Sequence, residues 1–192
     1  GNRNIDSVDV DNEQGTIDEV QYLYSLGHRQ IAYLRGPKDM SGANYRAEGF
    51  IKGMKRMNLD PRMVIDSEWS VKGGYEAAKQ LIQCEKFTAL LCSNEYCAYG
   101  AITALKDTGI KVPDDVSVAA FDEGTLSKFT EPAITTIKQP FRTLGEMAVK
   151  LLIDILNNES TAKTSILLHP SIIERASCDV TKHSCGEEKN EQ

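Results

Sequence analysis

The chain has 192 residues, of which 41% are hydrophobic and 26% charged, and its 22 basic and 28 acidic residues give a formal net charge of −6. A chain of this size and apolar content can bury a full core, so a disordered segment is excluded. An acidic chain is also a poor match for the phosphates that dominate binding to nucleic acid. No apolar stretch approaches the ~20 residues that span a bilayer, and the first eleven residues are polar, unlike a signal peptide.

The cysteines are five in number, and an odd count in a chain that needs no disulfides indicates free thiols and a cytoplasmic location. Cys92 and Cys97 stand five residues apart and could form one half of a metal site. No second pair follows and the three histidines are far away in the sequence, so we expect no metal and no other cofactor. The alternative is that Cys84, Cys92 and Cys97 pack as small apolar residues.

Helical and extended patterns alternate along the first two thirds of the chain. Thr16 and Glu19 have the spacing of a capping box, which predicts a helix that starts at Thr16, and Gly27 is placed to end it. Amphipathic segments of about a dozen residues follow, each between short apolar runs. They predict helices over 43–58, 71–84 and 95–108, and strands over 31–34, 63–65, 89–92 and 116–121.

Short apolar strands separated by amphipathic helices are typical of βαβ units. Such units build a parallel sheet with right-handed crossovers and helices on both faces. The sequence therefore predicts an α/β fold with a parallel sheet.

The regular alternation stops after Phe121. The segments that follow are predicted as strands at 134–137, 166–168 and 172–173 and as a helix at 144–156. In the tail beyond Cys178, Val180 is the one aliphatic residue, and we therefore predict a disordered tail over 179–192.

Polar or aromatic side chains follow five of the predicted strands. In an open parallel sheet, ligands bind beyond the carboxyl ends of the strands, near helix N-termini. At these positions the sequence has a cation, the only tryptophan, two amides and a carboxylate, namely Arg46, Trp69, Asn94, Gln139 and Asp122. Guanidinium, carboxylate and amide groups can orient hydroxyls or ring nitrogens, and tryptophan can stack on a sugar face or a base. We therefore predict a small-molecule site.

Each of these residues also has a structural interpretation. Arg46 could be a solvated helix residue, Asn94 and Asp122 could cap helices or turns, and Trp69 could cover the sheet edge. The sequence has no nucleophile elbow, no phosphate loop and no dinucleotide-binding glycine motif. We therefore assign no catalytic residue and expect a binding protein that is not an enzyme.

Short motifs stand at regular places along the chain, namely LGHRQIA at 26–32, RAEGF at 46–50, SNE at 93–95, GIKVPDDVSV at 109–118, PAITTIKQP at 132–140 and ERAS at 174–177. In this order and spacing, over roughly residues 8–178, they resemble the ligand-sensing domain of the lactose/galactose repressor (LacI/GalR) family of transcriptional regulators.

The resemblance implies a type I periplasmic-binding-protein-like fold, in which two α/β subdomains enclose an effector. It also implies a homodimer that presents helix-turn-helix heads to operator DNA. By this likeness Arg46, Trp69, Asn94, Asp122 and Gln139 fall on family effector contacts. The loop 38–44 lacks the arginine and threonine of purine-binding members, which favours a sugar or sugar derivative as the effector.

The resemblance divides the chain unequally between the two subdomains. Residues 11–138 and 168–178 correspond to one complete effector-binding subdomain, whereas 1–10 and 141–163 are pieces of the other. The DNA-binding head is missing, so we expect a fragment that supplies one wall of the effector cleft. In the family, the apolar face of the helix at 144–156 packs on the missing subdomain. We therefore expect this helix to be swapped between chains or weakly protected.

Two other functions are compatible with these features. A transport-type sugar-binding protein has the same fold, and an upstream signal peptide would identify it, as a helix-turn-helix would identify a regulator. The other is a regulator that docks a phosphorylated phosphocarrier protein. The free thiols and the motif at 135–140 favour the LacI/GalR type of regulator, without a membrane partner.

Overall fold

Helices and strands alternate along the chain in the computed structural model, which describes residues 5–157 and 163–182. The strands are β1 (Ser7–Val10), β2 (Ile31–Arg35), β3 (Val64–Asp66), β4 (Ala89–Cys92), β5 (Ser117–Phe121), β6 (Thr135–Lys138), β7 (Ser165–Leu168) and β8 (Ser171–Ile173). The helices are α1 (Asn12–Ser25), α2 (Ser41–Arg56), α3 (Val71–Cys84), α4 (Glu95–Asp107), α5 (Leu126–Phe129) and α6 (Phe141–Leu156). Within the described ranges, none of these helices has the length and apolar content needed to cross a membrane.

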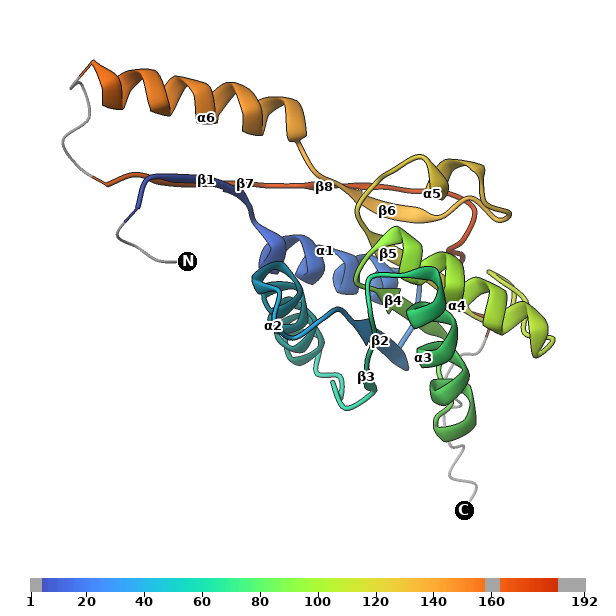
Figure 1. Ribbon diagram of the computed structural model, residues 1–192. Helices are drawn as coiled ribbons and strands as arrows, with labels where there is room; N and C mark the ends of the chain where they lie inside the picture. The colour runs from blue at the N-terminus through green and yellow to red at the C-terminus, as the bar shows by residue number, and fades with distance from the viewer. Residues whose placement is uncertain (1–4, 158–162, 183–192) are drawn as a thin grey trace.

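The main sheet has the strand order β3-β2-β4-β5-β6-β8. Its pairs are parallel except for β6 and β8, which run antiparallel. Helices α1 and α2 cover one face and α3 and α4 the other (Figure 1). The predicted α/β fold, a mainly parallel sheet with helices on both faces, is therefore confirmed.

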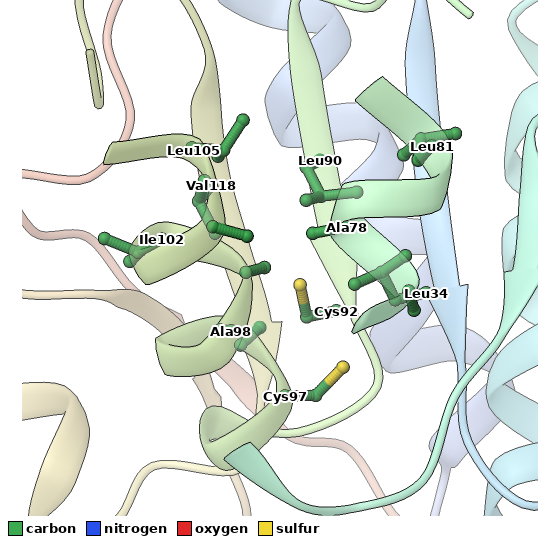
Figure 2. Close-up of a cluster of buried hydrophobic side chains, with 14 of the residues drawn as sticks. Leu34, Ala78, Leu81, Leu90, Cys92, Cys97, Ala98, Ile102, Leu105 and Val118 are labelled. Atoms are coloured by element: carbon green, nitrogen blue, oxygen red, sulfur yellow. The ribbon is translucent and has the colours of Figure 1, made fainter. Parts of the chain in front are cut away.

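The core between the sheet and helices α3 and α4 is apolar throughout (Figure 2). Leu90 and Val118 of the sheet meet Leu81 of α3 and Leu105 of α4, and all are at most 5% exposed. Burial of one such side chain stabilises the fold by roughly 1.5–3 kcal/mol. This layer therefore fixes α4 on the sheet, and α4 begins where β4 ends.

Two glycines allow α3 and α4 to pack very closely. A Cβ added at Gly74 would lie 2.1 Å from the carbonyl oxygen of Cys97, and one at Gly100 would lie 2.0 Å from that of Val71. Any side chain at either position would push the helices apart, so the first turns of α3 and α4 are held against each other.

The start of α1 differs from the prediction. The N-cap is Asp11, whose Oδ1 accepts a hydrogen bond from the Gln14 amide, so the helix begins at Asn12 and not at Thr16. The proposed capping box is wrong because Thr16 is interior and its hydroxyl donates to the Asn12 carbonyl, while Glu19 is buried. The other predicted bounds agree to within three residues, and the short helix α5 was not predicted.

The beginning of the predicted disordered tail is instead attached to the sheet. The amide of Thr181 donates to the Leu26 carbonyl, and the His28 ring lies 3.1 Å from the Asp179 carbonyl oxygen. The His28 ring is buried and also lies 3.0 Å from Ser117 Oγ of β5, which connects this part of the tail to the sheet. Disorder is therefore wrong for 179–182, and 183–192 lies outside the described residues.

A second, two-stranded sheet lies apart from the main one. In it β1 pairs in parallel with β7, and α6 runs alongside (Figure 1). No residue of α6 between Phe141 and Leu156 is buried, and its large apolar side chains are widely exposed. The exposed fractions are 58% for Val149, 55% for Leu152, 49% for Ile153 and 71% for Leu156. The most exposed face therefore differs from the predicted apolar face, because Leu144, Met147, Leu151 and Ile155 are partly buried. The expected swapping or weak protection of this helix stays a prediction.

The exposure of α6 predicts a difference in hydrogen exchange between two helices of similar length. Amides of α6 should exchange much faster than those of α4, because α4 is anchored by buried side chains and α6 by none. Hydrogen-exchange mass spectrometry on the monomeric chain measures this, with α4 as the internal reference. Protection of 141–156 equal to that of the central strands would contradict it.

Candidate functional site

The carboxyl ends of the parallel strands bring three of the predicted residues into direct contact. Arg46 of α2 donates from Nη1 to Asp122 Oδ2 at 3.0 Å and from Nη2 to Asp122 Oδ1 at 3.1 Å. Gln139, just beyond β6, donates from Nε2 to the same Asp122 Oδ1. The Arg46 side chain is 6% exposed and that of Asp122 is 33% exposed. The buried Arg46 guanidinium thus binds the Asp122 carboxylate in a bidentate manner, while this carboxylate stays partly accessible to solvent.

Arg46 has further partners on both sides. Its Nε donates to Asn12 Oδ1 at 2.9 Å, and its Nη1 also donates to the Ser93 carbonyl at 2.6 Å. The guanidinium carbon lies 3.8 Å from the centre of the Phe121 ring, in a cation–π contact. The interpretation of Arg46 as a solvated helix residue is therefore wrong.

Asp122 follows β5 directly and has a backbone φ of 71°. This left-handed conformation is uncommon for residues other than glycine and is often found where a side chain must be aimed at a functional site. Here it directs the carboxylate towards Arg46 and Gln139.

Trp69 is fixed at the same edge of the sheet. Its Nε1 donates to Ser93 Oγ at 3.0 Å, and its ring centre lies 5.5 Å from the Arg46 guanidinium carbon. A Cβ added at Gly36, just after β2, would lie only 2.2 Å from Trp69 Nε1. The glycine at this position therefore makes room for the indole, which can offer a flat surface to a ligand.

Asn94 has the structural role that the sequence left open. It is the N-cap of α4, and its Oδ1 accepts a hydrogen bond of 2.8 Å from the Cys97 amide. Because the side-chain oxygen is used by the helix and the residue is buried, an effector contact by Asn94 stays a prediction.

Asn12 and Ser93 complete the site, and neither was predicted. Asn12 donates from Nδ2 to the Val10 carbonyl, and its Oδ1 accepts the hydrogen bond from Arg46 Nε. The Ser93 hydroxyl accepts a hydrogen bond from Trp69 Nε1, and the Ser93 backbone carbonyl accepts one from Arg46 Nη1. The position of Ser93, next to Asn94 at the end of a strand, was the signal that could have identified it.

Glu19 is a buried carboxyl group beneath this site. It is 3% exposed, and its Oε1 has no hydrogen-bond partner among residues 5–157 and 163–182. Burial raises the pKa of Glu19 well above its ordinary value, Arg46 opposes this shift, and Asp122 and Asp18 add to it. Burial therefore favours the protonated, uncharged form of Glu19, and Arg46 pairs with Asp122.

Residues 20–178 match the family described as periplasmic binding protein-like domain. The chain belongs to this family. It is 33% identical over 174 residues to the HTH-type transcriptional repressor CytR of Escherichia coli K12, and 35% identical over 160 residues to the repressor PurR of Salmonella newport. These alignments cover 89% and 82% of the chain but 51% and 47% of the relatives, so the chain spans about half the length of the curated proteins it matches.

Solved structures agree with the family. A dimeric Lac repressor with an 11-residue C-terminal deletion superposes with a TM-score of 0.87 at 32% identity, over 92% of this chain and 65% of that one. The complex of the transcriptional regulator CelR with cellobiose gives a TM-score of 0.86 at 27% identity, over 92% of this chain and 55% of that one. The fold is the type I periplasmic-binding-protein-like fold of LacI-family regulators, and the chain corresponds to their effector-binding part.

The buried Glu19 predicts an unusual dependence of stability on pH. The folded chain keeps the Glu19 proton at pH values above 4.5, where the unfolded chain releases it, so its contribution to stability is lost as the pH rises through the folded-state pKa. Glu19→Gln preserves the shape of the protonated group. The free energy of unfolding of this variant relative to the parent should therefore rise as the pH increases above 4.5, by at most about 1.4 kcal/mol per pH unit, and should level off above the folded-state pKa.

Urea unfolding of the parent and both variants at each pH checks this prediction. Glu13→Gln provides the matched control, because Glu13 is on the same helix but is partly exposed and paired with Lys52. A difference between Glu19→Gln and the parent that stays constant with pH would show that Glu19 is not protonated in the folded chain.

Proposed function

We propose that the chain is the small-molecule-sensing core of a LacI/GalR-type transcriptional regulator. The observation that carries the proposal is the cluster of Arg46, Asp122, Gln139 and Trp69 at one edge of the sheet. All four lie where ligands bind in open parallel sheets, and the first three share hydrogen bonds. Asn94, at the head of α4, borders the same cluster through its neighbour Ser93.

The charge of the site favours a neutral, hydroxyl-rich effector, such as a sugar or sugar derivative. The positive charge of Arg46 is already matched by the Asp122 carboxylate, so an anionic group gains little from it. The carboxylate and the Gln139 amide can hydrogen bond to hydroxyls, while the Trp69 ring can stack on an apolar sugar face. The similarity to the CelR–cellobiose complex supports this class of ligand.

For the whole protein, we infer that effector binding changes the affinity of a helix-turn-helix head for operator DNA. A structurally similar Lac repressor dimer is bound to operator and the anti-inducer ONPF, with a TM-score of 0.86 at 33% identity. The relatives named above are repressors, which favours a cytoplasmic regulator over a transport protein or an enzyme.

We also infer a homodimer that uses α4. Tyr96 and Tyr99 of this helix are 51% and 39% exposed, and Phe129 of the neighbouring α5 is 82% exposed. Such large apolar side chains on one surface are typical of contact surfaces between subunits. The structurally similar Lac repressor is itself dimeric, which supports a homodimer.

Loss of the Arg46–Asp122 pair should weaken effector binding. In the full-length protein, Arg46→Ala and Asp122→Ala should each cost about 2–4 kcal/mol of binding free energy, because each leaves a polar partner unpaired. Calorimetric titration with a panel of mono- and disaccharides measures this, and Asp114→Asn, at an exposed ion pair with Lys182, is the control. Unchanged affinity in both alanine variants, with folding intact, would overturn the site.

The assembly can be tested separately from the ligand. Light scattering of the full-length protein should give a dimer, and the double change Tyr96→Ala and Tyr99→Ala should shift it towards monomer. Tyr24→Ala, at a partly exposed tyrosine of α1, should leave the mass unchanged. A dimer that resists the double change would place the contact elsewhere.

A further inference from the structure

The ERAS motif at 174–177 lies directly after β8, outside the cluster of side chains that forms the site. Strand β8 is an edge of the main sheet, and it continues the path of β7 from the second sheet (Figure 1). The motif therefore follows the segment that joins the two sheets, and its arginine, Arg175, makes several contacts with the main sheet.

Arg175 is anchored to β6. Its Nη1 donates to the Ile134 carbonyl and to Thr136 Oγ1, both at 2.8 Å. Its backbone amide donates to Thr135 Oγ1 at 2.9 Å, and the Arg175 side chain is 15% exposed. The guanidinium is therefore fixed in place by β6 and by the residue that precedes this strand.

The second terminal nitrogen of this guanidinium binds Glu123, the residue that follows Asp122. Arg175 Nη2 donates to Glu123 Oε1, while Lys128 and Lys138 lie 3.6 Å and 3.8 Å from the same carboxylate. The Glu123 side chain is 11% exposed, whereas those of the two lysines are 50% and 57% exposed. Because exposed charges contribute little to an ion pair, Arg175 is the main partner of Glu123.

The backbone of Asp122 is thus fixed on both sides. Before it, Phe121 is the last residue of β5 and pairs with Ile137 of β6. After it, Glu123 is held by Arg175. A residue other than glycine keeps a left-handed backbone, such as the φ of 71° at Asp122, where its surroundings impose it. The Glu123–Arg175 pair supplies one half of that constraint.

We propose that Arg175 is a positioning residue for the effector site, which aims the Asp122 carboxylate through its ion pair with Glu123. The consequence for effector affinity rests on the proposed function, whereas the aim of Asp122 does not. Because Arg175 follows β8, the edge strand of the main sheet becomes a determinant of effector affinity.

The alternative is an ion pair that only stabilises the fold. Loss of such a pair lowers the free energy of unfolding but leaves the folded site as it is. Loss of a positioning pair changes the folded site itself, because Asp122 can then leave its left-handed conformation. A signal from the native site therefore separates the two roles.

Nuclear magnetic resonance of the 192-residue chain tests the aim of Asp122 without a ligand. The Gln139 side-chain amide donates to Asp122 Oδ1, so its proton and nitrogen signals report on the position of that carboxylate. In Glu123→Ala we expect these signals to shift towards those of an amide without a carboxylate acceptor. Gln14, whose Nε2 donates to Asp18 Oδ1 at 2.8 Å on α1, is the matched amide that should not change.

Further variants show whether both residues act through one ion pair. Arg175→Gln should shift the Gln139 signals as Glu123→Ala does, and the double variant should shift them no further. Arg142→Gln, which removes an exposed ion pair with Glu146 on α6, is the control and should leave them unchanged. Circular dichroism confirms that each variant folds. Glu123→Ala keeps the β6 contacts of Arg175 and so decides the question if Arg175→Gln does not fold.

Two results of the resonance experiment would overturn the inference. One is a Glu123→Ala variant whose Gln139 signals coincide with those of the parent. The other is a double variant whose shift is the sum of the two single shifts, because the residues would then act on the site independently.

Calorimetric titration of the full-length protein with the saccharide panel measures the consequence for binding. In Glu123→Ala we expect the affinity to fall about tenfold, because the ligand then binds only the roughly one tenth of molecules in which Asp122 is aimed. Unchanged affinity in this variant, when the parent binds, contradicts the positioning role. A parent that binds no saccharide contradicts the proposed effector class, and the Gln139 signals alone then decide the role of Arg175.

Discussion

The guanidinium of Arg46 is the contact on which the arrangement of the strand-end segments depends. Its N–H groups reach Asn12 at the start of α1, Ser93 beyond β4 and Asp122 beyond β5. A cation that is 5% exposed is costly unless it is paired and fully hydrogen bonded, so these acceptors must meet at Arg46 for the fold to close. The same contacts that satisfy the buried charge therefore bring together the residues of the site.

The charges around Arg46 explain why the site presents a neutral surface. Burial favours the uncharged form of Glu19, which interacts electrostatically with Arg46, and this reduces the negative charge near the guanidinium. Asp122 alone balances Arg46, and Gln139 fixes the same carboxylate from the side. An ion pair that is already complete discriminates little by charge, so under the proposed function we expect recognition to depend on hydroxyl geometry and on the Trp69 ring.

The sequence predicted the residues whose position follows from topology. Arg46, Asp122 and Gln139 meet because the carboxyl ends of parallel strands share one edge, and this holds whatever the packing. Ser93 was missed because half of its role is played by a backbone carbonyl, which any residue supplies. The predicted start of α1 was wrong because Asp11 and Thr16 are both residue types that cap helices. Asp11 is the N-cap in the structure, and Thr16 is buried inside the helix, which depends on tertiary packing. Burial of Glu19 likewise depends on packing that periodicity alone does not show.

The first turn of α4 connects the inside of the site to the outside of the subdomain. Ser93 and Asn94 lead into this turn, where Ser93 binds Arg46 and Trp69 and Asn94 caps α4, while Tyr96 and Tyr99 of the same helix are exposed. The helix cannot move closer to α3, because at Gly74 and Gly100 the two backbones lie too close together to admit a Cβ. A displacement of Ser93 that presses α4 towards α3 would therefore move the two helices together, or be absorbed in the segment 92–97. In the first case the exposed tyrosines move with the site, which is the mechanical link that the proposed dimeric sensor requires.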